Sequence, residues 1–364
     1  MSGPARFELH GSRIVAGTGQ LDACGPLVRD ALGARRLCIV SDDTVAPLWA
    51  ARLATAIGDA AVPRFKIPAG EASKTRTQWS RLTDELLDAG FGRDSAILAL
   101  GGGVVGDLAG FVAATYMRGI PFVQVPTTLL AMIDASIGGK TGVDTRAGKN
   151  LVGAFHHPAL VVADPATLAT LPREQLRNGL AEAVKHAVVS ASDEFEWLER
   201  HLAVIASGEA DPGTLDTLVQ RHVAAKWRVV SNDERETGLR KVLNFGHTIG
   251  HAIEALSEYT LLHGECVAIG MVVEARAATL AGVTEPGVAD AIATMCEAAG
   301  LPTRVPASLD ARAVVAATRT DKKARGGHVE YAVPVRIGLM AAADLGYAVP
   351  LADAVIFDAL SASR

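Results

Sequence analysis

Residues 95–107 read SAILALGGGVVGD, and this stretch decides the expected fold. Its apolar first half predicts a buried strand, and three glycines follow at once. Gly101, Gly103 and Gly106 have the spacing of a dinucleotide-binding turn, in which a strand leads into a helix whose N–H groups face a pyrophosphate. The acidic residue expected about 20 positions later is missing, so an ordinary tight turn also fits. Asp42, which ends an earlier apolar run, is a better candidate for a ribose hydroxyl, or else it caps the following helix.

Further apolar runs extend this pattern on both sides. Strands are expected over residues 36–41, 122–125 and 160–163, which is the rhythm of a parallel α/β sheet. After Pro172 the spacing of apolar residues changes to three and four, which predicts amphipathic helices over residues 173–190, 215–231, 248–256, 264–281 and 287–299. The fold class is therefore α/β, with an N-terminal Rossmann-like parallel-sheet domain over residues 1–172 and a mostly α-helical domain over residues 173–364.

Composition limits the classes of function. With 364 residues, 49% of them hydrophobic, the chain is long enough for two buried cores. No apolar run reaches the roughly 18 residues that cross a bilayer, so we expect a cytoplasmic protein without a membrane partner. The net charge of −5 argues against a nucleic-acid partner. The cysteines stand singly, at Cys24, Cys38, Cys266 and Cys296, which favours buried free thiols.

Residues 126–150, PTTLLAMIDASIGGKTGVDTRAGKN, are unusually rich in small and polar residues. Glycines let the backbone approach a ligand closely, and loops of this kind often carry function. The stretch is therefore interpreted as a cofactor and substrate loop. Its hydrogen-bonding side chains are Thr127, Thr128, Asp134, Lys140, Lys149 and Asn150.

Three separate segments of the second half carry potential metal ligands: Glu182 in GLAEAVKH, His247 in NFGHTIGH and His263 in LHGE. One carboxylate and two imidazoles would leave a coordination position open, as catalytic zinc requires. Spacing does not select these three, because His247 and His251 lie four residues apart and could face one metal together. Glu182 could instead form a pair on the helix surface with Lys185 or His186, three and four residues further on.

Six stretches identify a family by resemblance. In chain order they are GGGVVGDLAGFVAATYMRG, QVPTTLLAMIDASIGGKTGVD, GKNLVGAF, GLAEAVKHA, LNFGHTIGHAIE and LHGECVAIGM. Spanning roughly residues 100–272, they resemble 3-dehydroquinate synthase, which closes a seven-carbon keto-acid phosphate into the first ring of the shikimate pathway.

The resemblance implies a role for each matching residue. NAD would be held by Asp42, Glu71, Lys74, Gly102, Gly103, Asp107, Thr127, Thr128, Lys149 and Thr170. A divalent metal, zinc or cobalt, would be held by Glu182, His247 and His263. The substrate carboxylate and phosphate would be met by Arg118, Lys140, Asn150, Lys185, Lys226, Arg240, Asn244, His251 and one of Lys322 and Lys323. Asp134 would lie between the substrate and cofactor layers.

The implied reaction converts 3-deoxy-D-arabino-heptulosonate 7-phosphate, a small anionic sugar phosphate, to 3-dehydroquinate and phosphate. It proceeds by transient oxidation by NAD, phosphate elimination, reduction and an intramolecular aldol closure. Ring opening and the aldol closure need mainly positioning, since both reacting centres belong to one held molecule. An apolar helical domain also suggests a homodimer.

Sister activities remain as alternatives. An aminodehydroquinate synthase keeps nearly all of these residues. Valiolone-type relatives usually have other amino acids at the positions of Asn244 and of the late lysine pair. A metal-dependent polyol dehydrogenase shares the two-domain plan but would not need the array of lysines. A binding protein that has lost its activity would usually have lost a metal ligand or charged contact, and the motifs keep them all.

Overall fold

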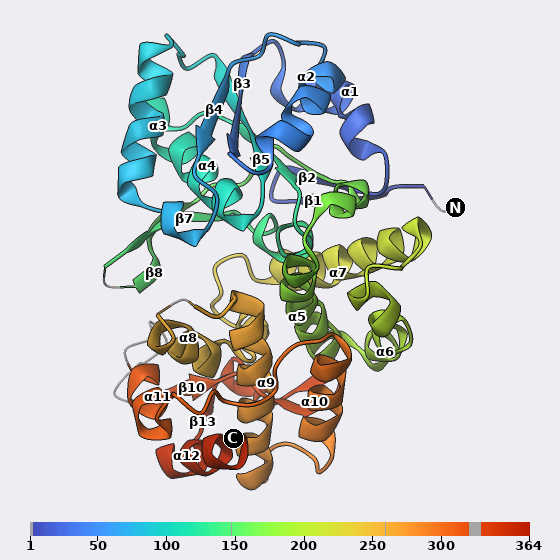
Figure 1. The fold of residues 1–364 in the computed structure, drawn as a ribbon, viewed down its shortest axis with the longest axis vertical. Helices are drawn as coiled ribbons and strands as arrows, with labels where there is room; N and C mark the ends of the chain where they lie inside the picture. Colours follow the sequence, from blue (N-terminus) through green and yellow to red (C-terminus); the bar gives the residue numbers. More distant parts are fainter. Residues whose placement is uncertain (1–2, 147, 259, 320–328) are drawn as a thin grey trace. The chain divides into compact units, whose positions relative to one another are not determined.

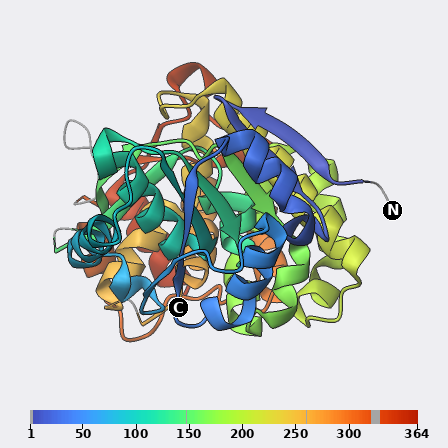
Figure 2. The same ribbon diagram turned by 90° about the horizontal axis from the view of Figure 1, so that it is seen from above.

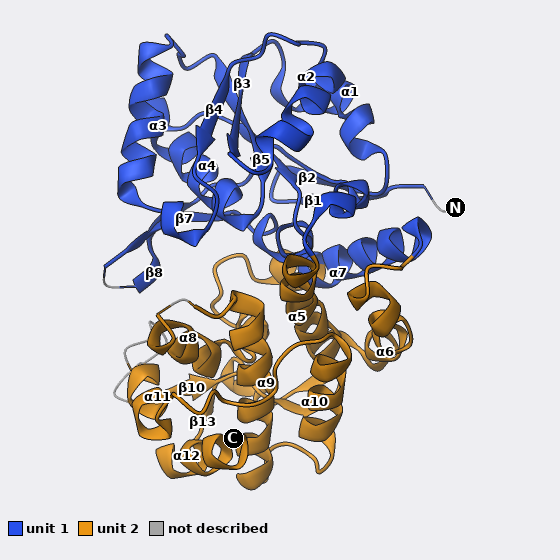
Figure 3. Cartoon of the chain, in the orientation of Figure 1, with its two compact units in different colours: residues 1–172, 211–227 blue, residues 173–210, 228–364 orange. Residues whose placement is uncertain are grey.

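The computed structural model describes residues 3–146, 148–258, 260–319 and 329–364. The chain forms two compact units, coloured separately in Figure 3. Unit 1 contains residues 1–172 and 211–227, and unit 2 contains residues 173–210 and 228–364. Residues 211–227, which the sequence pattern assigns to the helical half, thus belong with the first unit.

Unit 1 is built on a seven-stranded sheet in the order β1-β2-β9-β6-β5-β3-β4. All its neighbouring strands run parallel except β1 and β2, which form an antiparallel hairpin at one edge. The strands are β1 (Ala5–Leu9), β2 (Ser12–Ala16), β3 (Arg36–Asp42), β4 (Arg64–Ile67), β5 (Ser95–Gly101), β6 (Phe122–Pro126) and β9 (Leu160–Ala163). A separate antiparallel pair, β7 (Lys140–Thr145) and β8 (Gly148–Phe155), completes the strands of unit 1.

Helices cover both faces of the seven-stranded sheet (Figures 1 and 2). Helices α1 (Gln20–Leu32) and α2 (Ala51–Ile57) pack on one face, and their apolar residues form one buried cluster with those of the strands. Helices α3 (Arg76–Asp88) and α4 (Gly103–Thr115) form a second cluster on the other face. Because successive side chains of a strand point to opposite faces, the central strands contribute to both clusters. Short helical turns lie at Ala46–Ala50, Glu71–Ser73, Tyr116–Arg118, Ala131–Ala135 and Pro165–Thr170.

The order of strands reverses between β3 and β5, because β4 lies outside β3 whereas β6 and β9 continue beyond β5. Ligands of open α/β sheets bind at the carboxyl ends of the strands at such a reversal. Ser41 of β3 pairs with Leu100 of β5, so Asp42 and the glycine turn emerge side by side at this edge. The fold thus brings together two segments that are far apart in the sequence.

Helix α7 (Pro212–Asn232) contributes its first part to unit 1. Asp216 accepts hydrogen bonds from the backbone and hydroxyl of Thr18, at 2.7 and 2.9 Å. Gln220 donates to the carbonyl of Ala16, at 3.2 Å. These contacts fix the helix beside the β1–β2 edge of the sheet.

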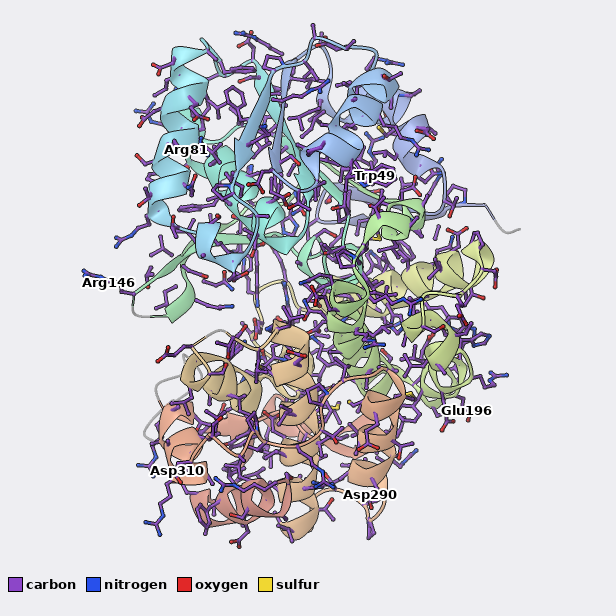
Figure 4. The ribbon with its side chains drawn as sticks, in the orientation of Figure 1. Trp49, Arg81, Arg146, Glu196, Asp290 and Asp310 are labelled. Carbon is purple, nitrogen blue, oxygen red and sulfur yellow. The ribbon has the colours of Figure 1, made fainter. Side chains whose placement is uncertain are left out.

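Unit 2 is mainly helical. Its helices are α5 (Arg173–Ser190), α6 (Ser192–Ala206), α8 (His247–Leu256), α9 (His263–Leu280), α10 (Val288–Ala298), α11 (Ala311–Thr318) and α12 (Asp353–Ala362). Short strands form two small antiparallel pairs, β10 (Glu330–Tyr331) with β13 (Val349–Pro350) and β11 (Pro334–Arg336) with β12 (Leu339–Met340). Local capping is visible at α11, where the Asp310 carboxylate, labelled in Figure 4, accepts from the N–H of Ala313. Further helical turns lie at Leu239–Asn244 and Ala343–Leu345.

The expected fold class is confirmed: a mostly parallel sheet is followed by a helical part. The four predicted strands are present as β3, β5, β6 and β9, and the five predicted helices as α5, α7, α8, α9 and α10. The interpretation of residues 126–150 as a loop was wrong for the second half of that stretch, which forms the β7–β8 hairpin. Glycines at the paired positions Gly142 and Gly153 let the two strands lie close together.

Candidate active site

The glycine turn of unit 1 has the packing that a dinucleotide-binding turn needs. A Cβ atom on Gly106 would lie 2.7 Å from Oε1 of Gln124 on β6, so a larger residue would push the end of that side chain aside where α4 meets the sheet. A Cβ on Gly102 would lie 3.1 Å from Cγ2 of Thr128, and one on Gly103 would lie 3.4 Å from Cβ of Ala135. Gly102 precedes α4 and has no side chain that could cap the helix. The first N–H groups of α4 can therefore donate hydrogen bonds to a bound anion.

Asp42 lies at the neighbouring strand end and caps the turn that follows it. Its carboxylate accepts the N–H groups of Thr44 at 2.9 Å and Val45 at 2.7 Å. Burial raises the pKa of Asp42, although these two hydrogen bonds act in the opposite direction. Asp42 therefore has the capping role that was one alternative expected from the sequence. Its contact with a ribose hydroxyl stays a proposal.

A buried ion pair stands beside the glycine turn. Nζ of Lys74 lies 2.5 Å from Oδ2 of Asp107 on α4, and their side chains are only 5% and 18% exposed. Nζ of Lys149 lies 3.3 Å from the carboxylate of Glu71, and Asp144 accepts the backbone N–H of Asn150 at 2.9 Å. Burial alone would lower the pKa of Lys74, but the carboxylates of Asp107, Glu71 and Asp144 outweigh it and raise that pKa. The cluster thus holds a firmly charged ammonium group.

A second pair in unit 1 joins Asp134 to Lys226 of α7. Nζ of Lys226 lies 2.7 Å from Oδ1 of Asp134 and also donates to the Asp134 carbonyl at 2.5 Å. Burial raises the pKa of Asp107, whereas the ammonium group of Lys74 and, less strongly, that of Lys226 act to lower it. The two pairs therefore belong to one electrostatic neighbourhood.

The remaining candidates of unit 1 lie nearer to solvent. Lys140 and Asn150 are exposed on the β7–β8 hairpin, and Asn150 has a positive φ of 53°. Arg118 is exposed in a turn where it and Met117 both adopt positive φ, 68° and 51°. Thr170 is exposed, and its hydroxyl accepts from the indole N–H of Trp49 at 3.0 Å.

One buried hydroxyl tests whether this half fits NAD. Thr127 follows the end of β6 and is 4% exposed, and no described residue hydrogen-bonds to its Oγ1. Buried polar atoms are nearly always satisfied, so an unsatisfied one at a strand end is a natural contact for a polar ligand. Gly102 has no side chain that would keep a ligand away from the backbone, so this position and the Thr127 hydroxyl together fit a dinucleotide.

Unit 2 brings the three predicted metal ligands together. Oε1 of Glu182 on α5 lies 3.5 Å from Nε2 of His247 and 3.4 Å from Nε2 of His263, and Glu182 is fully buried. Candidate ligand atoms of the three residues all lie within 4.8 Å of one another. One carboxylate with two imidazoles suits zinc or cobalt, so the donor set fits a catalytic metal. Each imidazole starts a helix, α8 at His247 and α9 at His263.

The pKa values of the two imidazoles shift in opposite directions. Burial lowers the pKa of His247 well below its usual value, and the nearby Lys185 ammonium lowers it further. Burial also acts to lower the pKa of His263, but hydrogen bonds to Glu182 and Glu254 outweigh it and raise that pKa to about 10. Lys185 contacts Glu182 one helical turn away, and the pair is buried, unlike the surface pair considered from the sequence.

His251 stands near the same ligands. Its ring centroid lies 5.3 Å from that of His247 and 6.1 Å from that of His263. His251, Glu254 and His263 also form a second group whose ligand atoms lie close together, sharing His263 with the first.

Arg240 and Asn244 lie in or at the end of the short helix before α8. Arg240 is 3% exposed and donates to the carbonyl of Glu234 at 2.6 Å, and Asn244 donates to the carboxylate of Glu236 at 2.6 Å. Lys322 and Lys323 lie outside the described residues.

Sequence reasoning missed several carboxylates that contact the candidate residues. Asp144 faces the Lys74 cluster, Glu236 holds Asn244, and Oε1 of Glu254 lies 3.7 Å from Nδ1 of His263. Glu254 could have been found, because it follows His251 by three residues and therefore shares its helix face. The sequence carries no such signal for the other two.

Fold and site together place the chain in the class of sugar-phosphate cyclases. It is similar to a solved structure of 2-deoxy-scyllo-inosose synthase complexed with carbaglucose-6-phosphate, NAD+ and Co2+, with a TM-score of 0.90 and 26% identity over 99% of this chain and 100% of the other. It is also similar to 2-epi-5-epi-valiolone synthase from Streptomyces hygroscopicus with NAD+ and Zn2+ bound, with a TM-score of 0.85 and 32% identity over 100% and 98%. A probable glycerol dehydrogenase from Sinorhizobium meliloti, 18% identical with a TM-score of 0.67 over 96% and 95%, shares the fold alone.

The sequence comparisons define the family. Residues 64–178 match the 3-dehydroquinate synthase N-terminal family, and residues 179–324 match the 3-dehydroquinate synthase C-terminal family. The chain is 48% identical to 3-dehydroquinate synthase of Symbiobacterium thermophilum, over 89% of this chain and 91% of that one. It is 43% identical to that of a Synechococcus species, over 92% of both. The chain belongs to the 3-dehydroquinate synthase family of enzymes.

No helix in the described part of the chain is long and apolar enough to span a bilayer.

Proposed function

We propose that the chain converts 3-deoxy-D-arabino-heptulosonate 7-phosphate to 3-dehydroquinate and phosphate, using NAD and a zinc or cobalt ion. The observation that carries the proposal is the convergence of Glu182, His247 and His263 from three separate segments, in a chain that belongs to this family. A small sugar phosphate fits both the family and the clustered cationic side chains.

Unit 1 would hold NAD at the carboxyl ends of β3, β5 and β6. NAD bound there would serve as a transient acceptor for the hydride of the carbon that carries a substrate hydroxyl, with the hydroxyl releasing a proton, and the same hydride would be returned to that carbon later in the turnover. The Thr127 hydroxyl is available for a cofactor hydrogen bond, and Gly102 and Gly103 let the backbone approach the pyrophosphate. The ion pair of Lys74 and Asp107 would fix the start of α4 beside the cofactor. Asp42, Glu71, Thr128, Lys149 and Thr170 complete the proposed cofactor residues.

In unit 2, Glu182, His247 and His263 would hold the metal, which would act as a Lewis acid on substrate oxygens. Lys185 keeps a buried positive charge beside Glu182, and this charge favours the carboxylate form that a metal ligand needs. His251, one turn after His247, would hold or move a proton at an imidazole nitrogen rather than bind the metal.

The substrate anions would be met by basic and amide side chains of each unit. In unit 1 these are Arg118, Lys140, Asn150 and Lys226, with Asp134 holding Lys226 in place. In unit 2 they are Lys185, Arg240 and Asn244, joined by Lys322 or Lys323. Such groups would compensate the negative charges of the phosphate and carboxylate while the ring closes.

The proposal extends to organisation and location. Residues 1–172 would act as the NAD-binding domain and residues 173–364 as the metal- and substrate-binding domain. The first part of α7, which carries Lys226, lies in unit 1. We also propose a cytoplasmic location and a homodimer, the latter supported by the apolar character of the helical domain. Sedimentation of the purified protein would measure the oligomeric state.

The decisive experiment is an assay of the purified protein with the heptulosonate phosphate, NAD and zinc or cobalt, in which phosphate and ring product are both measured. We expect phosphate and 3-dehydroquinate in equal amounts, and no net NADH. Accumulation of NADH in step with product would identify a dehydrogenase and reject the proposal. Turnover only of the amino analogue, or only of sedoheptulose 7-phosphate, would identify one of the sister cyclases.

A further inference from the structure

Helix α8 begins with His247 and lacks a cap of its own. The residue before it, Gly246, has no side chain and adopts a positive φ of 79°. The capping group comes instead from α9, where Glu274 is fully buried. Oε2 of Glu274 accepts the N–H of Gly246 at 2.7 Å, and Oε1 accepts the N–H of Ile249 at 2.9 Å.

These two hydrogen bonds satisfy the same two backbone N–H groups as a complete capping box. In that motif one side chain accepts the N–H of the third helical residue, and a second accepts the N–H of the capping residue. Here Ile249 is the third helical residue and Gly246 the capping residue, so a single carboxylate serves both. Its negative charge also lies at the positive end of the helix dipole. His247 lies between the two anchored N–H groups.

Close packing fixes how α8 lies on α9. A Cβ atom on Gly270 of α9 would lie 1.9 Å from the carbonyl oxygen of Gly246, and one on Gly250 of α8 would lie 3.0 Å from the carbonyl oxygen of Cys266. The two backbones therefore touch where the capping bonds form, and a contact packed this closely is hard to compress.

Helix α9 thus helps to place both imidazoles of the metal site. It begins with His263 itself, and about three turns further along it carries Glu274. The capped start of α8 then sets where His247 lies, and both Nε2 atoms reach the same oxygen of Glu182.

We propose that Glu274 is a positioning residue, which holds His247 at the distance from His263 that metal binding requires. This inference rests on the proposed function, because it takes Glu182, His247 and His263 as the ligands. Buried groups that orient metal ligands commonly contribute about 10- to 100-fold to metal affinity.

Metal affinity of the Glu274→Gln variant tests the inference. Glutamine keeps the shape, but its NH₂ group faces one of the two backbone donors, so one capping bond is lost. Cobalt alone is titrated into the metal-stripped full-length chain, while the visible spectrum of the bound ion reports its coordination. We expect cobalt affinity to fall about 10- to 100-fold and the spectrum to change.

Two variants serve as controls. Thr284→Val removes another buried hydrogen bond of unit 2, from Thr284 to the Pro334 carbonyl at 2.6 Å, and should lower stability without changing cobalt affinity or spectrum. His263→Ala should lose cobalt. If Glu274→Gln binds cobalt like the natural chain, or if Thr284→Val weakens binding equally, the inference is wrong.

Undiminished cobalt binding by His263→Ala would instead reject the ligand set of the proposed function. Should Glu274→Gln not fold, Glu274→Asp decides the question, since it keeps the charge but withdraws it by one methylene. Unchanged cobalt affinity in that variant would also reject the inference.

Discussion

Replacing Lys74 with methionine should destabilise unit 1 strongly at neutral pH. Lys74 and Asp107 are both largely buried, at 2.5 Å from each other, so Lys74→Met leaves the Asp107 carboxylate buried without its principal cation. Removing one member of a buried pair typically costs about 3–5 kcal/mol of unfolding free energy. We expect a loss of this size in urea unfolding at pH 7.

The pH dependence gives the prediction a second test. Burial already holds the pKa of Asp107 above its ordinary value, and Lys74 is the largest influence that lowers it. Without Lys74 this pKa rises further, so the folded state takes up a proton more readily than the unfolded state does. The destabilisation is therefore fully present above the raised pKa and shrinks as pH falls through it. Unfolding at pH 5 should show a smaller loss than at pH 7.

A matched control lies on α3 in the same unit. Arg81, labelled in Figure 4, pairs with Glu85 one turn away, and each side chain is 37% exposed. Exposed pairs of this kind contribute only about 0.3–0.5 kcal/mol, and the other hydrogen bonds of this guanidinium, to Gln78 and to the Lys66 carbonyl, also involve an exposed side chain. Arg81→Met should therefore cost much less stability than Lys74→Met. A loss for Lys74→Met as small as that of the control, and equal at both pH values, would refute the reasoning.

Four other outcomes follow from the structure. Lys226→Ala should reduce kcat/KM for the sugar phosphate by the equivalent of about 2–5 kcal/mol with little change in NAD affinity, and equal losses in both would contradict its substrate role. His251→Ala should retain the metal and lose turnover whereas His263→Ala loses both, and metal analysis showing the reverse would make His247 and His251 the ligand pair. Burial raises the pKa of Cys38 to about 12, so iodoacetamide at pH 8 should label this thiol only after unfolding, and rapid labelling of the native protein would contradict the burial. Because the unfolded thiol ionises at lower pH, its contribution to stability should disappear as pH rises from about 9 toward 12.

The sequence predicts those parts of unit 1 whose signals are local. The apolar run of β5 and the glycines after it predict a strand, a turn and a helix, and all three are present. The β7–β8 hairpin was missed, because its paired glycines Gly142 and Gly153 carry no side chain that could alternate between two faces. Periodicity also predicted α7 correctly, but an apolar stripe does not say what it packs against, and the first part of this helix lies in unit 1.

The candidate site divides in the same way. Motif order selected Glu182, His247 and His263, whereas their spacing left the pair of His247 and His251 equally open. Their convergence depends on the packing of α5, α8 and α9, which no local pattern encodes. Glu274 gave no signal at all, because its partners are two backbone N–H groups of a distant segment.

The composition of unit 1 has a consequence for how the chain is made. Its last structural piece is the first part of α7, which arrives only after the ribosome has also produced α5 and α6. Until then the β1–β2 edge lacks Asp216, Gln220 and Trp227, whose indole N–H donates to the Glu8 carbonyl at 2.6 Å. A nascent chain released at residue 172 would thus be an incomplete folding unit with an uncovered sheet edge, a known starting point for aggregation. Recombinant pieces of this enzyme should be cut after residue 227 or not at all.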